Sequence, residues 1–184
     1  MRLFAAIVPP PSVLDHLEHA LDQVIPSRAG QRNPRTPRST WHVTLAFFGE
    51  VPEGDVPRLA ADFADLVTEH APFALELAGA GTFSSRTAWV GVAGALPALK
   101  RLAADVRGLW FEPDGDESGQ AHRPHLTISR QAARAGLHEP LKALAVYRGP
   151  EWTVTTATLF ESRLGHGVGG HALYVPVVEA PLGQ

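Results

Sequence analysis

The sequence His-Val-Thr-Leu at residues 42–45 has a near copy, His-Leu-Thr-Ile, at residues 125–128, almost half a chain length away in a chain of 184 residues. Each copy alternates a polar residue with an apolar one, and its aliphatic and β-branched side chains favour a strand. Residues two apart in a strand point to the same face. Each histidine is therefore expected to share a face with its threonine, while the apolar residues point into a core.

Two histidines held in this way suit the hydrolysis of a phosphodiester. One group must deprotonate the attacking water, and another must protonate the leaving oxygen on the far side of phosphorus. The unperturbed pKa of histidine, about 6.5, allows both roles. The hydroxyls of Thr44 and Thr127 can donate to the non-bridging oxygens, where negative charge grows. The residues alone leave open which histidine is the acid and which is the base.

The residues around the two copies resemble a known family. The first copy continues as Ala-Phe-Phe-Gly-Glu to residue 50, and the second lies in Arg-Pro-His-Leu-Thr-Ile-Ser-Arg at residues 123–130. With these flanks the chain resembles the 2H phosphoesterases, and among them the RNA 2′,3′-cyclic phosphodiesterases, also called 2′-5′ RNA ligases. Residues 1–7 and 159–164 resemble the same family, so the resemblance covers nearly the whole chain.

The resemblance implies an α+β, bilobal 2H phosphoesterase-like fold. Two antiparallel sheets would be related by pseudo-twofold symmetry around a central cleft, with the helices on the outside. Residues 1–184 would form a single domain of two interleaved lobes. The implied activity is metal-independent hydrolysis of a terminal RNA 2′,3′-cyclic phosphate to a 2′-phosphomonoester, without a cofactor, and with reversible 2′-5′ RNA ligation in some members. His42 would be the proton donor to the leaving 3′-oxygen, and His125 would be the proton acceptor.

The resemblance also implies phosphate ligands. Thr44 and Thr127 would hold phosphate oxygens, and Arg130 would add a charge-assisted contact. Strict alternation, however, places Arg130 on the face opposite His125, so to touch phosphate it must lie beyond the regular part of the strand or reach around it. Ser129 falls on the His125 face and is a rival phosphate ligand.

Other residues near the first copy are open to two interpretations. Phe48 shares a face with His42, so it is a candidate to stack on a nucleobase, or equally a core residue. The indole of Trp41 should point away from His42 and pack. Ala46 stands where many relatives carry a basic residue, which removes one possible phosphate contact.

Hydrophobic periodicity gives the order of elements. Strands are expected near 2–8, 41–48, 73–82, 87–93, 125–130, 152–162 and 171–178, and helices near 12–24, 55–69, 96–109 and 136–145. The strand pairs within 73–93 and 152–178 are typical of hairpins, which favours antiparallel sheet. The glycine cluster at 165–170 leads into a strand, so it predicts a hairpin loop and not a phosphate cradle.

Charge bears on the kind of partner. The net charge is −3, which argues against a protein that coats nucleic acid through bulk charge. Four arginines without an intervening acidic residue nevertheless precede His42: Arg28, Arg32, Arg35 and Arg38. They predict either a cationic loop for a phosphate chain or an ordinary solvated loop. His122 and His125 invite a metal interpretation, but Pro124 between them makes a shared helical face improbable.

RNA with a 2′,3′-cyclic phosphate end, or a nucleoside 2′,3′-cyclic phosphate, is therefore the expected partner. One alternative is a small nucleotide such as an ADP-ribose cyclic phosphate, but the arginine loop favours RNA over it. Another is a non-catalytic RNA-end-binding protein, but the two intact His–Thr pairs favour an enzyme. No membrane partner is expected, and the chain is predicted to be a monomer. Without cysteines or a long apolar run, a cytoplasmic location is the default expectation.

Overall fold

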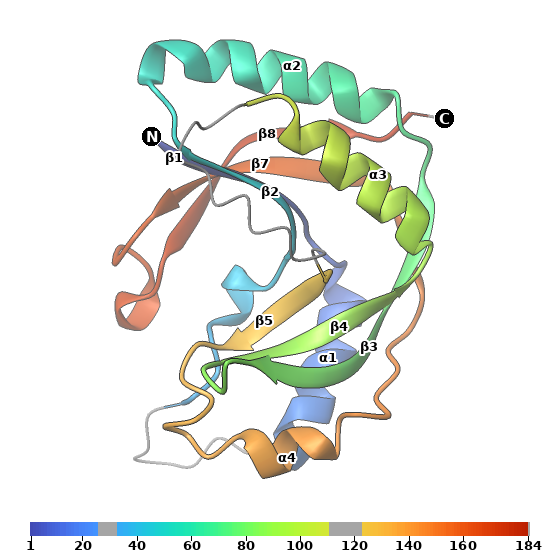
Figure 1. Cartoon of the computed structure of the whole chain (residues 1–184), viewed down its shortest axis with the longest axis vertical. Helices are drawn as coiled ribbons and strands as arrows, with labels where there is room; N and C mark the ends of the chain where they lie inside the picture. Colours follow the sequence, from blue (N-terminus) through green and yellow to red (C-terminus); the bar gives the residue numbers. More distant parts are fainter. Residues whose placement is uncertain (26–32, 111–122, 184) are drawn as a thin grey trace.

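The computed structural model describes residues 1–25, 33–110 and 123–183 (Figure 1). The strands of this part are β1 (Arg2–Ile7), β2 (Val43–Glu50), β3 (Phe73–Phe83), β4 (Thr87–Gly94), β5 (His125–Ser129), β6 (Trp152–Val154), β7 (Thr156–Arg163) and β8 (Leu173–Pro181). The helices are α1 (Pro11–Val24), α2 (Val56–Thr68), α3 (Leu96–Arg107) and α4 (His138–Lys142), with 3-10 turns η1 (Arg38–Thr40), η2 (Glu53–Asp55) and η3 (Val168–Gly170).

The strands form one curled antiparallel sheet in the order β6-β3-β4-β5-β2-β1-β7-β8. Its two halves, β6-β3-β4-β5 and β2-β1-β7-β8, meet where Val43 of β2 pairs with Leu126 of β5. Each half carries one His–Thr copy at its inner strand. Because β2 and β5 are antiparallel, a local twofold axis passes between them and relates the two copies. The predicted α+β fold is confirmed, and the two expected sheets are the two halves of one continuous sheet.

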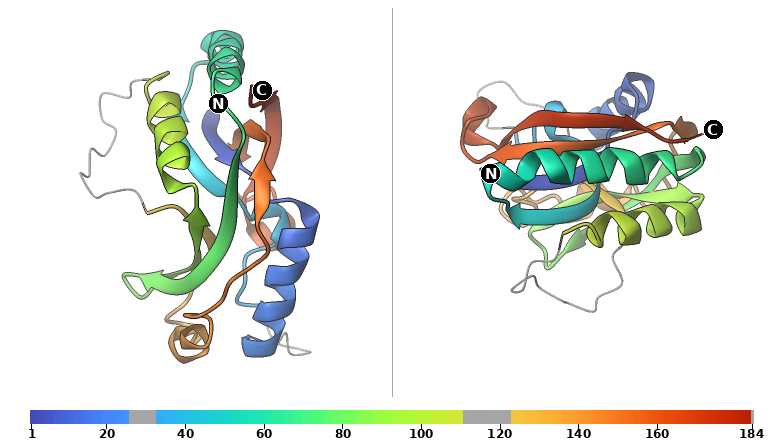
Figure 2. Two further views of the ribbon diagram at one scale, coloured as in Figure 1. Left: turned by 90° about the vertical axis from the view of Figure 1, so that its right-hand side faces the viewer. Right: turned by 90° about the horizontal axis from the view of Figure 1, so that it is seen from above.

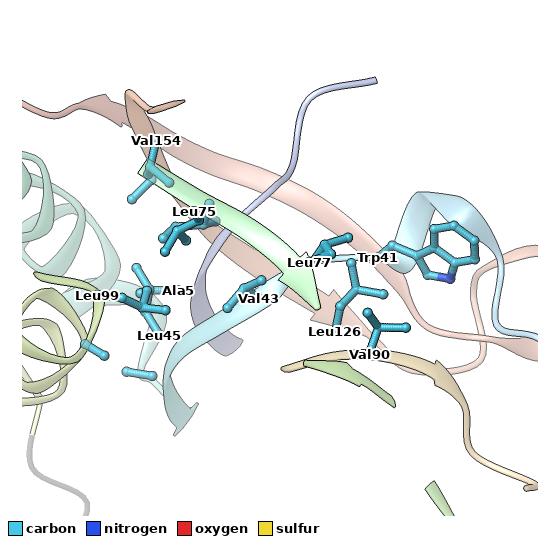
Figure 3. Close-up of a cluster of buried hydrophobic side chains, with 14 of the residues drawn as sticks. Ala5, Trp41, Val43, Leu45, Leu75, Leu77, Val90, Leu99, Leu126 and Val154 are labelled. Atoms are coloured by element: carbon cyan, nitrogen blue, oxygen red, sulfur yellow. The ribbon is translucent and has the colours of Figure 1, made fainter. Parts of the chain in front are cut away.

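The core lies on the face of the sheet to which Val43 and Leu126 point. Both are completely buried, among aliphatic residues from both halves (Figure 3). Helices α2 and α3 lie side by side, with α3 against β2 and α2 against β8 (Figure 2). Trp41 belongs to the same core, and its Nε1 donates to Oγ1 of Thr36 at 3.1 Å. The prediction that Trp41 packs is confirmed.

The predicted single strand at 152–162 is wrong. It is two strands, separated at Thr155, that belong to different halves of the sheet: β6 pairs with β3, and β7 pairs with β1. Residues 152–160 are nearly all strand formers without a turn residue, so the local sequence does not mark the crossing. Long-range pairing decides it, and the crossing interleaves the two halves along the chain.

The other elements lie close to their predicted positions. The glycine cluster forms the loop between β7 and β8, as predicted, and Gly165, Gly169 and Gly170 have positive φ there. Helix α4 is shorter than the predicted helix at 136–145. In the part of the chain that the structure describes, no helix is long and apolar enough to cross a membrane.

Candidate active site

The two His–Thr copies converge on one face of the sheet. Because Val43 and Leu126 pair and both point into the core, their neighbours in the chain point to the opposite face. The antiparallel register also sets His42 across from Thr127 and Thr44 across from His125. All four side chains line one cleft of about 660 Å³. The structure therefore brings together the four residues that the repeat singles out.

A β-bulge follows each threonine at the same position. Leu45 is the extra residue where β2 pairs with β1, and Ile128 is the extra residue where β5 pairs with β4. An extra residue reverses the alternation of faces beyond it. Phe47 and Arg130 consequently return to the cleft face, and both line the cleft. Arg130 follows the last residue of β5, which ends one residue earlier than predicted, so the first of the two expected arrangements is the observed one.

The same bulges remove two candidate ligand contacts. Phe48 is 1% exposed and belongs to the core, so of its two interpretations the core residue is confirmed and the stacking residue is wrong. Ser129 is also buried. Its Oγ donates to the carbonyl of Pro34 at 2.7 Å and accepts from the backbone N–H of Gln131 at 3.1 Å, so it is not a phosphate ligand. Phe47, which the sequence reasoning missed, is 69% exposed in the cleft.

Both histidines are oriented by the same backbone contact. Nδ1 of His42 lies 2.8 Å from the carbonyl oxygen of Thr40, and Nδ1 of His125 lies 2.9 Å from that of Arg123. A carbonyl oxygen only accepts, so Nδ1 carries the proton in each ring. Nε2 is therefore the nitrogen at which each ring can gain a proton.

Burial makes His42 electrostatically distinct. It lowers the pKa of His42 to about 4, and the positive charges of Arg130 and His125 act in the same direction, while the hydrogen bond to Thr40 opposes them. His42 is therefore neutral at pH 7 in the ligand-free protein. An anion bound in the cleft would offset the burial and the nearby charges, and would raise this pKa.

Aromatic rings from distant strands enclose both imidazoles. The rings of Phe4 and Tyr174 lie 4.9 and 5.3 Å from that of His42, and the ring of Phe83 lies 4.9 Å from that of His125. Phe83 and Tyr174 meet their histidines edge-on, at 81°. Since these rings come from β1, β3 and β8, no local spacing in the sequence marks them.

The cleft is positive although the chain is negative. Its described lining contains no aspartate or glutamate, but it includes Arg2, Arg130 and His171 beside the two site histidines. The net charge of the whole chain is −3. The cleft is thus suited to an anion.

The described arginines of the predicted cationic loop are used in ion pairs. Arg35 is buried and pairs with Asp22 at 2.7 Å, while Arg38 pairs with Asp15 at 2.6 Å and with Glu18 at 2.7 Å. These contacts fasten the loop and η1 to α1 and leave little net charge for a phosphate chain. Arg28, Arg32 and His122 lie outside the described residues.

A metal centre has no donor set in the described ranges, where no three histidine, aspartate or glutamate side chains are grouped as ligands.

Comparisons with known proteins identify the family of the chain. A model of the 2′-5′ RNA ligase superfamily matches residues 8–166. An RNA 2′,3′-cyclic phosphodiesterase of Thermus thermophilus is 32% identical over 91% of this chain and 93% of its own length. One of Geobacillus stearothermophilus is 36% identical over 59% of this chain, but the match spans only 38% of that longer protein.

The fold comparison covers the whole chain. The crystal structure of E. coli LigT complexed with 3′-AMP superimposes with a TM-score of 0.75 at 26% identity, covering 100% of this chain and 98% of that one.

Proposed function

Because the chain belongs to the 2′-5′ RNA ligase superfamily, we propose that it hydrolyses the 2′,3′-cyclic phosphate at an RNA end to a 2′-phosphomonoester, with His42 and His125 as general acid and base. The observation that carries the proposal is the arrangement of two His–Thr pairs in one cleft whose described lining contains no aspartate or glutamate. The names of the relatives from Thermus and Geobacillus support the same activity.

In the proposed reaction, Nε2 of His125 takes a proton from a water as its oxygen attacks phosphorus. The bond from phosphorus to the 3′-oxygen breaks on the opposite side, and Nε2 of His42 gives that oxygen a proton. A 3′-hydroxyl and a 2′-phosphomonoester result. The assignment of acid and base follows the family resemblance. Thr44, Thr127 and Arg130 are proposed to stabilise the charge on the non-bridging oxygens.

Because the pKa of His42 is low, the proposed acid must take up its proton when the substrate binds. An acid must be protonated before it acts, but His42 is neutral at pH 7 in the empty cleft. The cyclic phosphate carries one negative charge, which favours the imidazolium when it lies beside the ring. Binding of the substrate and protonation of His42 are therefore coupled in this proposal.

These residues supply both proton transfers and the charge stabilisation, so we propose a reaction without metal or cofactor. The same two groups, in the same roles, would give 2′-5′ ligation if the 5′-hydroxyl of a second RNA replaced water as the nucleophile, and the reverse of that step would cleave the 2′-5′ bond. Both histidines come from one chain, which supports a monomer as the active form. We place the enzyme in the cytoplasm, where RNA ends would be its substrates.

Phe47 is proposed to stack on the terminal base, because its ring is more exposed than that of Phe83, the other exposed phenylalanine that lines the cleft. The alternative substrate, a small nucleotide such as an ADP-ribose cyclic phosphate, would use the same centre. Arg35 and Arg38 are paired with carboxylates of α1, so the arginine loop favours RNA over a small nucleotide less than its sequence suggests. The preference for RNA rests on the names of the relatives.

The test is turnover in EDTA of three substrates: a short RNA ending in a 2′,3′-cyclic phosphate, adenosine 2′,3′-cyclic phosphate and an ADP-ribose cyclic phosphate. The expected result is undiminished hydrolysis of the RNA to the 2′-phosphomonoester. Loss of activity in EDTA with recovery on adding a divalent metal, or a 3′-phosphate product, would contradict the proposed chemistry. Faster turnover of the ADP-ribose compound would favour the alternative substrate. Tight binding without turnover would indicate an RNA-end-binding protein.

A further inference from the structure

Arg2 is a charged residue of the cleft that has no role in the proposed reaction. Phe4 contacts His42 and so points to the cleft face, and Arg2, two residues earlier in β1, shares that face. Arg2 is exposed and lines the cleft. No ion pair within the described ranges includes it, and the carboxylate of Glu50, its cross-strand neighbour, lies 3.8 Å from the terminal amine of Met1.

The register of β1 and β2 places Arg2 beyond the aromatic part of the cleft. Ala6 pairs with Thr44, and Phe4 pairs with Phe47. Arg2 lies one more step along the strand, roughly 13 Å from the level of Thr44. The cleft therefore presents, in order, the four central residues, the two phenylalanines and a guanidinium.

Ser162 lies beside Arg2 in the sheet. Leu3 pairs with Glu161 of β7, so the next residue of β7, Ser162, adjoins Arg2. Ser162 also pairs with Tyr174 of β8, and both line the cleft. Glu161, by contrast, pairs with Arg163 and is absent from the cleft lining. A guanidinium and a hydroxyl therefore lie on one surface, while the two nearby carboxylates, those of Glu50 and Glu161, lie against other cations. Such a combination of donors suits a phosphate group.

We propose that Arg2 and Ser162 bind the phosphate on the 5′ side of the terminal nucleoside. This inference rests on the proposed function. If the cyclic phosphate lies between the histidines and the base stacks on Phe47, the ribose lies along β1. Its 5′-phosphate then points toward Arg2. The planar guanidinium can donate two hydrogen bonds to that phosphate. This subsite would make the enzyme prefer a phosphorylated RNA end to an isolated nucleoside cyclic phosphate.

The experiment compares kcat/KM for three substrates in EDTA: adenosine 2′,3′-cyclic phosphate, the same compound with a 5′-phosphate, and a dinucleotide ending in the cyclic phosphate. The readout is the ratio of kcat/KM with the 5′-phosphate to that without it. Such a ratio cancels any loss of folded protein. The monoester and the dinucleotide distinguish a free phosphate from one within a chain.

The wild-type protein should favour both substrates that carry a 5′-phosphate, and Arg2→Ala should lower that ratio about tenfold. Arg2→Lys should retain part of the preference, and Ser162→Ala should lower it less. Arg58→Ala, which removes an exposed arginine of α2, is the matched control and should leave the ratio unchanged.

Two failures can be told apart. Turnover of all three substrates with a ratio that is near one in the wild type, or that Arg2→Ala does not change, overturns the subsite and leaves the proposed function intact. Absence of turnover for every cyclic phosphate overturns the proposed function, and the subsite with it.

Discussion

His42 is the residue at which burial and proposed chemistry conflict most clearly. Burial keeps its ring neutral, whereas a general acid must carry a proton. We predict that the His42 ring titrates with a pKa of about 4 in the free protein and at a higher pH when a nucleoside 2′-monophosphate is bound. NMR titration of the histidine ring protons checks this. Arg130→Ala should raise the free value, because it removes a nearby positive charge. A free-protein pKa near 6.5 would contradict the account.

The same shift has a consequence for stability. The pKa of His42 is lower in the folded protein than the ordinary value of 6.5. Between pH 6.5 and 4 the unfolded chain therefore binds a proton at His42 that the folded chain does not bind. The free energy of unfolding consequently falls as pH falls. We expect His42 to contribute a loss of about 3 kcal/mol across this window.

Denaturant unfolding at pH 7 and at pH 4.5 measures that loss. His42→Gln is the control, since glutamine does not titrate, and it should lose less stability than the wild type over the same interval. Equal losses in the two proteins would contradict the expected effect.

Phe47 and Phe48 form a matched pair for a second residue-scale test. We predict that Phe47→Ala lowers kcat/KM for an RNA cyclic phosphate by about tenfold or more, because one base loses its stacking partner, with little change in stability. Phe48→Ala should lower the free energy of unfolding by about 3–5 kcal/mol, because it empties a core position. Steady-state kinetics and urea unfolding separate the two effects. The reverse pattern would show that the faces are assigned wrongly.

At the scale of the elements, the two bulges explain how much of the site could be predicted from sequence. The histidines and threonines precede the bulges, so simple alternation places them correctly. Beyond Leu45 and Ile128 the alternation reverses, and there the prediction is wrong for Phe48 and Ser129. A bulge depends on the partner strand, and nothing within β2 or β5 marks it. Phe47 and Arg130 do follow their histidines at equal distances in the sequence, and that symmetry was the available signal.

Strand β4 leaves no room for a side chain at Gly91, the cross-strand partner of His125. Gly91 pairs with His125, and a Cβ at Gly91 would lie 2.7 Å from the carbonyl oxygen of Ala78 in β3. We predict that Gly91→Ala lowers the free energy of unfolding by about 1–3 kcal/mol, because the β3–β4 pair must separate. Gly54→Ala is the control, since an added Cβ there has no neighbour within 4 Å. Chemical denaturation compares them, and equal stabilities would contradict the close approach.

At the scale of the whole molecule, two halves of one sheet share a positive cleft. The His–Thr repeat and the antiparallel hairpins predicted one shared site and an α+β fold, and the family resemblance implied that the site lies in a central cleft. The crossing at Thr155 and the ion pairs of Arg35 and Arg38 with α1 were not predictable, since both depend on segments far apart in the sequence. The charge of the cleft likewise emerges only when residues from both halves come together.

In the proposed mechanism, His42 and His125 act as one unit on one phosphate. The test is hydrolysis of adenosine 2′,3′-cyclic phosphate in EDTA by His42→Ala, His125→Ala and the double variant. Each single change should lower kcat by about 100- to 10,000-fold, and the double variant should be about as slow as the slower single one, because residues that act together are not additive. Losses that multiply in the double variant, or full activity in either single one, would contradict the account.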